Sequence, residues 1–170
     1  GNGSPAVSQA ALNALARLGG DEVDSDLRDR MPKSEGKVKK AIIQVAGLRY
    51  ISGTLPTIAQ SLSDPDPGIR AAAVSTVGAI GEEQQIGQLV KLLSQASSAD
   101  RSDISSALLA ISGRKGGSCV AELTKLSGNS DSELRIIALH GLAAAGGPEA
   151  LGALRSAVDD KEESVQDEAV

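Results

Sequence analysis

A turn followed by a helix, best preserved at residues 64–81 (DPDPGIRAAAVSTVGAIG), recurs along this chain of 170 residues. When the unit is anchored on Arg70, equivalent residues follow at steps of 31, with a single step of 34 after Arg101. The anchor positions are Ser8, Lys39, Arg70, Arg101, Arg135 and Gln166. Residues at offsets −1, +3, +7 and +10 from the anchors are apolar, apart from Asp100 and Arg49, and these offsets share one face of an α-helix. The repeat therefore predicts a chain made of copies of one helical unit.

Shorter apolar segments between the anchored helices predict a second helix in each unit. Their apolar positions are Val23, Leu27 and Met31; Leu55, Ile58 and Leu62; Ile86, Leu89, Leu92 and Leu93; Val120, Leu123 and Leu126; and Leu151, Leu154 and Val158. The positions where an anchored helix is expected to end are marked by Gly19, Gly81, Gly113 and Gly146. We expect the three extra residues of the long step to lie between Arg114 and Ser132, where glycine and serine are frequent.

A two-helix unit cannot bury its apolar face alone, so such units stack on one another. No stretch alternates polar and apolar residues over the length of a strand, and we predict no β-sheet. The expected fold is all-α, a right-handed α-α superhelix (alpha solenoid) of about five helical hairpins. It is treated as a single domain over residues 1–170, a fragment or a domain of a longer chain, because Gly1 to Ser4 look like a cloning remnant and the last helix looks cut short.

The composition of the chain argues against several classes of function and of site. The chain has one Tyr and no Phe or Trp, so its core must be built from Ala, Leu, Ile and Val. A net charge of −5 argues against a nucleic-acid partner, because phosphates require a basic surface. A single cysteine, Cys119, is too little for a disulfide framework or a Cys-based zinc site. No apolar run approaches the ~20 residues that span a bilayer, no signal peptide is visible, and we expect a cytoplasmic protein unless an upstream export signal is missing.

The stretches DPDPGIRAAAVSTVGAIG and NSDSELRIIALHGLAAAG (129–146) resemble HEAT repeats, most closely the short bacterial kind of the phycobilisome-lyase type. The resemblance implies a binding scaffold whose repeats carry a ladder of Asp and Arg residues, here Asp64 or Asp66 and Asp131 with the anchors. Ser8 and Gln166 replace the arginine at the two ends, so the ladder is expected to be incomplete there.

Two enzyme branches and one nucleic-acid branch resemble the same repeats. Deoxyhypusine hydroxylase needs paired His-Glu metal motifs, and His140 is the only histidine of this chain. A bilin-lyase role would call for more aromatic or polar side chains, and a DNA-glycosylase role for cationic and aromatic ones. We therefore predict a non-enzymatic protein-interaction scaffold that needs no cofactor. The alternatives left open are an accessory subunit of a bilin-lyase-like enzyme and a nucleic-acid-associated repeat protein.

The helical register also predicts which side chains face away from the core. Offsets +1, +5 and +8 from each anchor form a stripe of small, nearly neutral residues on the expected concave face. The predicted protein-binding residues are Lys40, Gln44, Ala71, Ser75, Ser102, Ser106, Leu109, Ile136 and His140. This stripe either receives a protein or peptide partner or merely lets neighbouring helices pack closely. It contains no convergent acid, base and nucleophile, and we expect a monomer.

Other candidate residues have plainer interpretations beside the functional ones. His140 is an exposed histidine or a pH-sensitive contact, and Cys119 is a small core residue or a thiol activated at a helix start. The basic cluster, Arg28, Arg30, Lys33, Lys37, Lys39, Lys40 and Arg49, is a solvated face or a phosphate-binding edge. The segment 113–118 lacks the order of a phosphate-binding loop and is expected to be a turn.

Overall fold

The structure, a computed structural model, describes residues 5–170, and the regular secondary structure of this part of the chain is helical, without a strand. The chain forms two compact units, residues 1–81 and 82–170, which are described separately below. No helix within the described range combines the length and the apolar composition needed to cross a membrane.

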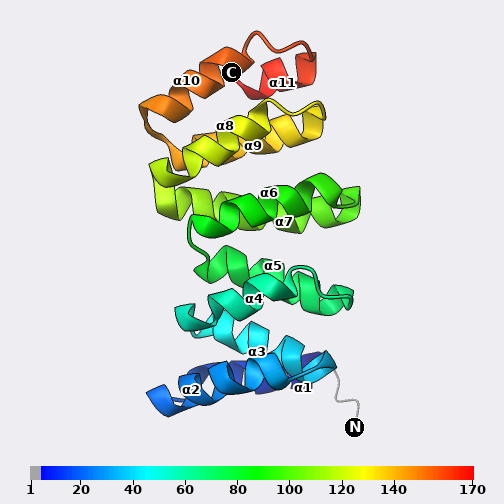
Figure 1. Cartoon of the computed structure of the whole chain (residues 1–170), viewed down its shortest axis with the longest axis vertical. Coiled ribbons are helices and arrows are strands. Elements are labelled where there is room, and N and C mark those ends of the chain that lie inside the picture. Colours follow the sequence, from blue (N-terminus) through cyan, green and yellow to red (C-terminus); the bar gives the residue numbers. More distant parts are fainter. Residues whose placement is uncertain (1–4) are drawn as a thin grey trace. The chain divides into compact units, whose positions relative to one another are not determined.

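The first unit has two layers of helices (Figure 1). Its elements are α1 (Pro5–Arg17), α2 (Asp21–Arg30), the short 3-10 helix η1 (Met31–Lys33), α3 (Gly36–Leu48), η2 (Ser52–Thr54), α4 (Leu55–Ser61) and α5 (Pro67–Ile80). Helix α3 packs against α1 on one side and α5 on the other, so the three anchored helices form one row. Helices α2 and α4 pack on α3 and α5 respectively and form the second layer. Aliphatic residues such as Ile43, Ile58 and Val77 are fully buried between the layers.

The second unit repeats this plan (Figure 1). It contains α6 (Gln84–Gln95), α7 (Ser98–Lys115), η3 (Gly116–Cys119), α8 (Val120–Ser127), α9 (Ser132–Ala145), α10 (Gly147–Ala157) and α11 (Glu163–Glu168). Helix α9 packs between α7 and α11, whereas α8 packs against α6, α9 and α10. The buried residues include Leu89, Leu108, Leu123 and Leu142, all at positions that the repeat predicts to be apolar.

Aspartate side chains fix where the anchored helices begin. The Asp66 carboxylate accepts hydrogen bonds from the amides of Gly68 (2.7 Å) and Ile69 (3.3 Å), and Pro67 occupies the first turn, where no amide donor is needed. In α9 the Asp131 carboxylate accepts from the amide of Glu133 at 3.0 Å. The Asp-rich turn of the repeat is therefore a helix cap.

One predicted helix end is wrong. Gly113 lies inside α7, which continues to Lys115 before Gly116, at φ +57°, turns the chain. Helix α7 ends 14 residues after its anchor Arg101, whereas α5 ends 10 residues after Arg70. The extra residues of the long step thus lengthen the helix by about one turn, and the insertion begins before Arg114 rather than in the following loop.

Some predicted core positions are exposed. Val38 is 61% exposed, and Leu15 and Leu18 are also exposed, whereas the repeat places all three on the inward face. Helix α2, with its acidic sequence DEVDSDLRDR, buries none of its residues and packs on α3 and η1, so it does not cover Leu15 and Leu18. In the second unit, Leu151 and Val158 of α10 are exposed because the six-residue α11 packs on α9.

Arg49 breaks the apolar pattern for a structural reason. Its Nε donates to an Asp24 carboxylate oxygen at 2.5 Å, and its Nη1 donates to the carbonyl oxygens of Ala16 (3.3 Å) and Leu18. These carbonyls end α1 and have no partner within the helix. A cation at this position therefore caps the preceding repeat, and an aliphatic side chain could not do so.

Candidate functional site

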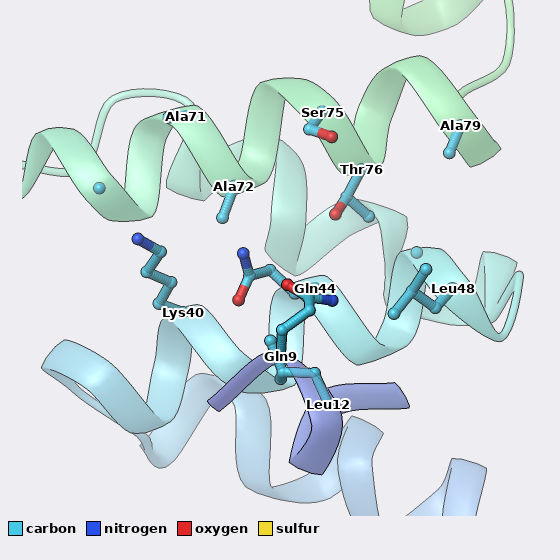
Figure 2. Close-up of a pocket in the computed structure, with 12 residues that line it drawn as sticks. Gln9, Leu12, Lys40, Gln44, Leu48, Ala71, Ala72, Ser75, Thr76 and Ala79 are labelled. Atoms are coloured by element: carbon cyan, nitrogen blue, oxygen red, sulfur yellow. The ribbon is translucent and has the colours of Figure 1, made fainter. Parts of the chain in front are cut away.

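The first unit has a groove of about 320 Å³ across its row of anchored helices (Figure 2). Residues from α1, α3 and α5 line it, including Gly68 at the start of α5. The lining residues are Gln9, Leu12, Lys40, Gln44, Gly47, Leu48, Gly68, Ala71, Ala72, Ser75, Thr76 and Ala79. We call this surface the α1–α3–α5 groove.

Four of the nine predicted binding residues lie together in this groove. Lys40 and Gln44 come from α3, and Ala71 and Ser75 come from α5 at the same repeat positions, +1 and +5. Ala71 and Ser75 are exposed, and Lys40 and Gln44 are partly exposed. The side chains of these four residues point away from the core and line the same groove. They do so because α3 and α5 have the same helical register relative to their anchors.

Sequence reasoning missed one flank of the groove. Ala72, Thr76 and Ala79 stand at offsets +2, +6 and +9, and Leu48 also stands at +9. These positions lie one residue further around each helix than the predicted stripe. The signal that could have identified them is the recurrence of small or aliphatic residues at +9 in successive copies.

A close contact between α3 and α5 sets the depth of the groove. A methyl group placed on Gly47 would come within 2.9 Å of the Thr76 hydroxyl oxygen, so no larger residue fits without displacement. The Thr76 hydroxyl donates to the carbonyl oxygen of Ile43 at 3.1 Å and is therefore fixed. Gly78, which the register also places on the open stripe, is instead buried and does not line the groove.

The two ends of the groove differ in chemistry (Figure 2). The Lys40 ammonium lies at the end where α5 begins, close to Gly68, and Leu48 and Ala79 lie at the opposite end. Ser75 and the Gln44 carboxamide lie between them. Lys40 is the one charged side chain among the described residues that line the groove.

The other five predicted residues belong to the second unit. Ser102 and Ser106 are exposed on α7, where the Ser106 hydroxyl donates to the Ser102 carbonyl at 2.9 Å, and Leu109 is half-buried. Ile136 and His140 are half-buried on α9. The His140 Nε2 lies 2.6 Å from a Glu168 carboxylate oxygen of α11, so this imidazole has a partner within the chain.

A ladder of charged groups links successive repeats. Lys39 pairs with Asp64 at 2.7 Å, and Arg135 pairs with both oxygens of Asp160 at 2.8 and 2.9 Å. Asp64 and Asp160 each stand six residues before the next anchor, which decides between Asp64 and Asp66 in favour of Asp64. At the corresponding position, six residues before the anchor Arg135, the chain has Asn129, and Arg101 binds Asp131 (2.9 Å) and Glu133 instead.

These pairs lower the pKa of the carboxylates in the folded state. The hydrogen bond from Lys39 lowers the pKa of Asp64, and the hydrogen bonds from Arg135 lower that of Asp160. At Asp131, burial acts to raise the pKa, but the hydrogen bonds from Arg101 and from the Glu133 amide outweigh it and the pKa is lowered. Each group thus favours the folded state when it is ionised.

We therefore expect the free energy of unfolding to fall in acid. A carboxylate whose folded pKa lies below its unfolded value of about 3.9 stabilises the fold above that value. Its contribution is lost as the pH falls through the folded pKa, because the unfolded chain then binds more protons. Urea unfolding at a series of pH values should show a plateau above about pH 5 and a decline below about pH 4. Asp160→Asn should flatten the decline and the exposed neighbour Asp159→Asn should not; a pH-independent stability would contradict this account.

The remaining candidate residues have structural roles. Cys119 is buried, and burial raises the pKa of its thiol, which identifies it as a core residue. Three cations of the basic cluster, Arg30, Lys39 and Arg49, are held by carboxylates. The segment 113–118 contains the end of α7 and the start of η3, as a helix-to-helix connection. No group of His, Cys, Asp and Glu side chains suited to a metal ion occurs in the described part of the chain.

Two layers of helices built from one repeated unit define an α-solenoid repeat protein. The sequence profile of the family described as HEAT repeats matches residues 32–109 and 89–170, and the chain belongs to this family. The match does not distinguish the phycobilisome-lyase type from other HEAT repeats. No curated protein matches the sequence.

Solved structures share the fold. A designed armadillo repeat protein in complex with the peptide (KR)4 is 21% identical, with a TM-score of 0.55 over 98% of this chain and 92% of its own. Another designed armadillo repeat protein is 19% identical, with a TM-score of 0.54 over 99% of this chain and 92% of its own. An engineered protein, also 19% identical, has a TM-score of 0.57 over 94% of this chain and 86% of its own. The architecture is that of the armadillo and HEAT solenoids, a fold that generally serves as a binding scaffold.

Proposed function

We propose that this chain is a non-enzymatic scaffold that binds a segment of another protein in the α1–α3–α5 groove. The observation that carries the proposal is the hollow itself: four side chains predicted to face a partner, Lys40, Gln44, Ala71 and Ser75, line one groove. Exposed small residues on α5 let a partner backbone come close to the helix, and Gln44 supplies both a donor and an acceptor. A groove of this kind positions a bound chain and offers no group poised to react with it.

Two further observations support a protein partner. One of the solved structures with this fold, the designed armadillo repeat protein, is described in complex with a peptide. Carboxylates hold Arg30, Lys39 and Arg49 of the basic cluster, which leaves less of it to contact nucleic-acid phosphates. We therefore favour a protein segment over nucleic acid. We also propose that the chain acts as a monomer.

The proposal is tested by filling the groove. Peptides selected from a random display library on the whole chain should bind the Ser75→Trp variant at least about tenfold more weakly, because an indole at Ser75 occupies the space of the ligand. Fluorescence anisotropy measures the affinity, and circular dichroism checks that the helices are intact. The control Ser156→Trp alters an exposed serine of α10, outside the groove, and should bind normally.

Selected peptides that bind Ser75→Trp as tightly as the unaltered chain would show that the groove is not the binding surface. A library that yields no binding peptide would also count against a peptide-binding scaffold.

A further inference from the structure

The charge of the α1–α3–α5 groove opposes that of the protein. The chain carries a net charge of −5, yet the charged side chain among the described lining residues is a lysine, Lys40. Lys39, its neighbour in sequence, is paired with Asp64, whereas Lys40 forms no ion pair with any carboxylate that the structure describes. Asp66, the residue that caps the start of α5 near Lys40, already accepts hydrogen bonds from the amides of Gly68 and Ile69. The ammonium of Lys40 is thus available to a carboxylate from outside.

The opposite end of the groove is apolar. Leu48 is a large aliphatic residue and is nevertheless 50% exposed. Ala79 of α5 lies at the same end of the groove. Covering such a side chain with an aliphatic group of a ligand is favourable by roughly 25 cal/mol per Å² of apolar surface removed from water. This end therefore favours an aliphatic side chain over a charged one.

The distance between the two ends sets the spacing of the ligand. Lys40 and Leu48 are eight residues apart on one helix, about 12 Å at a rise of about 1.5 Å per residue. An extended chain advances about 3.3 Å per residue and returns to the same face every second residue. Side chains four residues apart in an extended peptide are therefore about 13 Å apart and point the same way.

Resting on the proposed function, we propose that the groove binds an extended acidic segment of a partner protein. One carboxylate pairs with Lys40, an aliphatic side chain four residues away covers Leu48, and the intervening backbone lies along Ser75 and Gln44. The expected ligand is opposite in charge to the (KR)4 peptide of the designed armadillo repeat protein.

The test selects peptides from one random library on three versions of the whole chain: unaltered, Lys40→Glu and Lys33→Glu. The unaltered chain should enrich sequences with Asp or Glu four residues from Leu, Ile or Val, in one order or the other. Lys40→Glu should weaken binding of those peptides by about tenfold or more and enrich Lys or Arg in place of the acid. Lys33→Glu makes the same change of charge at an exposed residue of the same unit outside the groove, and should select the same peptides as the unaltered chain.

The outcomes separate this inference from the proposed function. Peptides that lose affinity on Ser75→Trp but are basic, or are unaffected by Lys40→Glu, would overturn the acidic ligand and keep the groove as the site. Acid and aliphatic residues enriched seven or eight positions apart would indicate a helical ligand and overturn the extended one. Peptides indifferent to Ser75→Trp, or no enrichment at all, would overturn both proposals.

Discussion

Replacing Arg135 by alanine is expected to lower the stability of the second unit by about 2–4 kcal/mol. The Arg135 side chain is 3% exposed, and its guanidinium makes four hydrogen bonds: two with the Asp160 carboxylate and two with the carbonyl oxygens of Asn129 and Ser130 (3.0 and 3.1 Å). Alanine leaves all of these acceptors without their donor. Because both the turn before α9 and the turn before α11 depend on this one side chain, the loss should appear in both.

Hydrogen exchange measured by mass spectrometry on the whole chain resolves this effect by segment. Amides of α9 and α11 should exchange faster in Arg135→Ala, and Arg135→Lys should be intermediate because it keeps the charge but not the fork of donors. The control is Arg155→Ala, which removes the same charge from an exposed residue of α10 and should change stability by less than about 0.5 kcal/mol. Equal effects of Arg135→Ala and Arg155→Ala would mean that the ladder does not hold the turns.

Sequence periodicity predicts this ladder only in part. The repeat period shows that Arg70 and Arg135 are equivalent and predicts an acidic turn before each anchored helix. Both features belong to a single repeat, so the sequence of that repeat is enough to find them. Which carboxylate each cation reaches depends on the next repeat in space. Asp64 accepts from Lys39, whereas Arg101 turns to Asp131 and Glu133 because the corresponding residue, Asn129, carries no charge.

The candidate site was likewise predictable only where a feature depends on a single repeat and not on the packing of its neighbour. The register predicts Lys40, Gln44, Ala71 and Ser75 because a +1 or +5 residue points away from the core in every copy. It does not predict that Gly78 is buried, nor that Thr76 and Leu48 line the groove, because these depend on how closely α3 and α5 approach. Whether Ser102, Ser106, Leu109, Ile136 and His140 contact a partner stays a prediction.

A pattern of apolar residues likewise cannot distinguish a covered helix from an uncovered one. Leu123 of α8 and Leu151 of α10 are both apolar positions of a second helix in the sequence pattern. Leu123 is fully buried, between α8 and α9, where its methyl groups lie so close to Gly141 that a Cβ there would come within 2.7 Å. Leu151 is 47% exposed. The difference comes from the neighbours: α6, α9 and α10 surround α8, whereas α10 buries only Ala150.

The substitution Leu123→Ala is therefore expected to destabilise the second unit by about 2–5 kcal/mol, and Leu151→Ala by less than about 1 kcal/mol. The first removes buried methyl groups and leaves a cavity beside Gly141, which has no side chain to fill it; the second removes apolar surface that water already contacts. Urea unfolding followed by circular dichroism, with hydrogen exchange of α8 and α9 as a local probe, measures both variants. Similar losses of stability for the two leucines would mean that α10 is covered as fully as α8. Leu151 would then be buried, as the sequence pattern predicts, and not exposed.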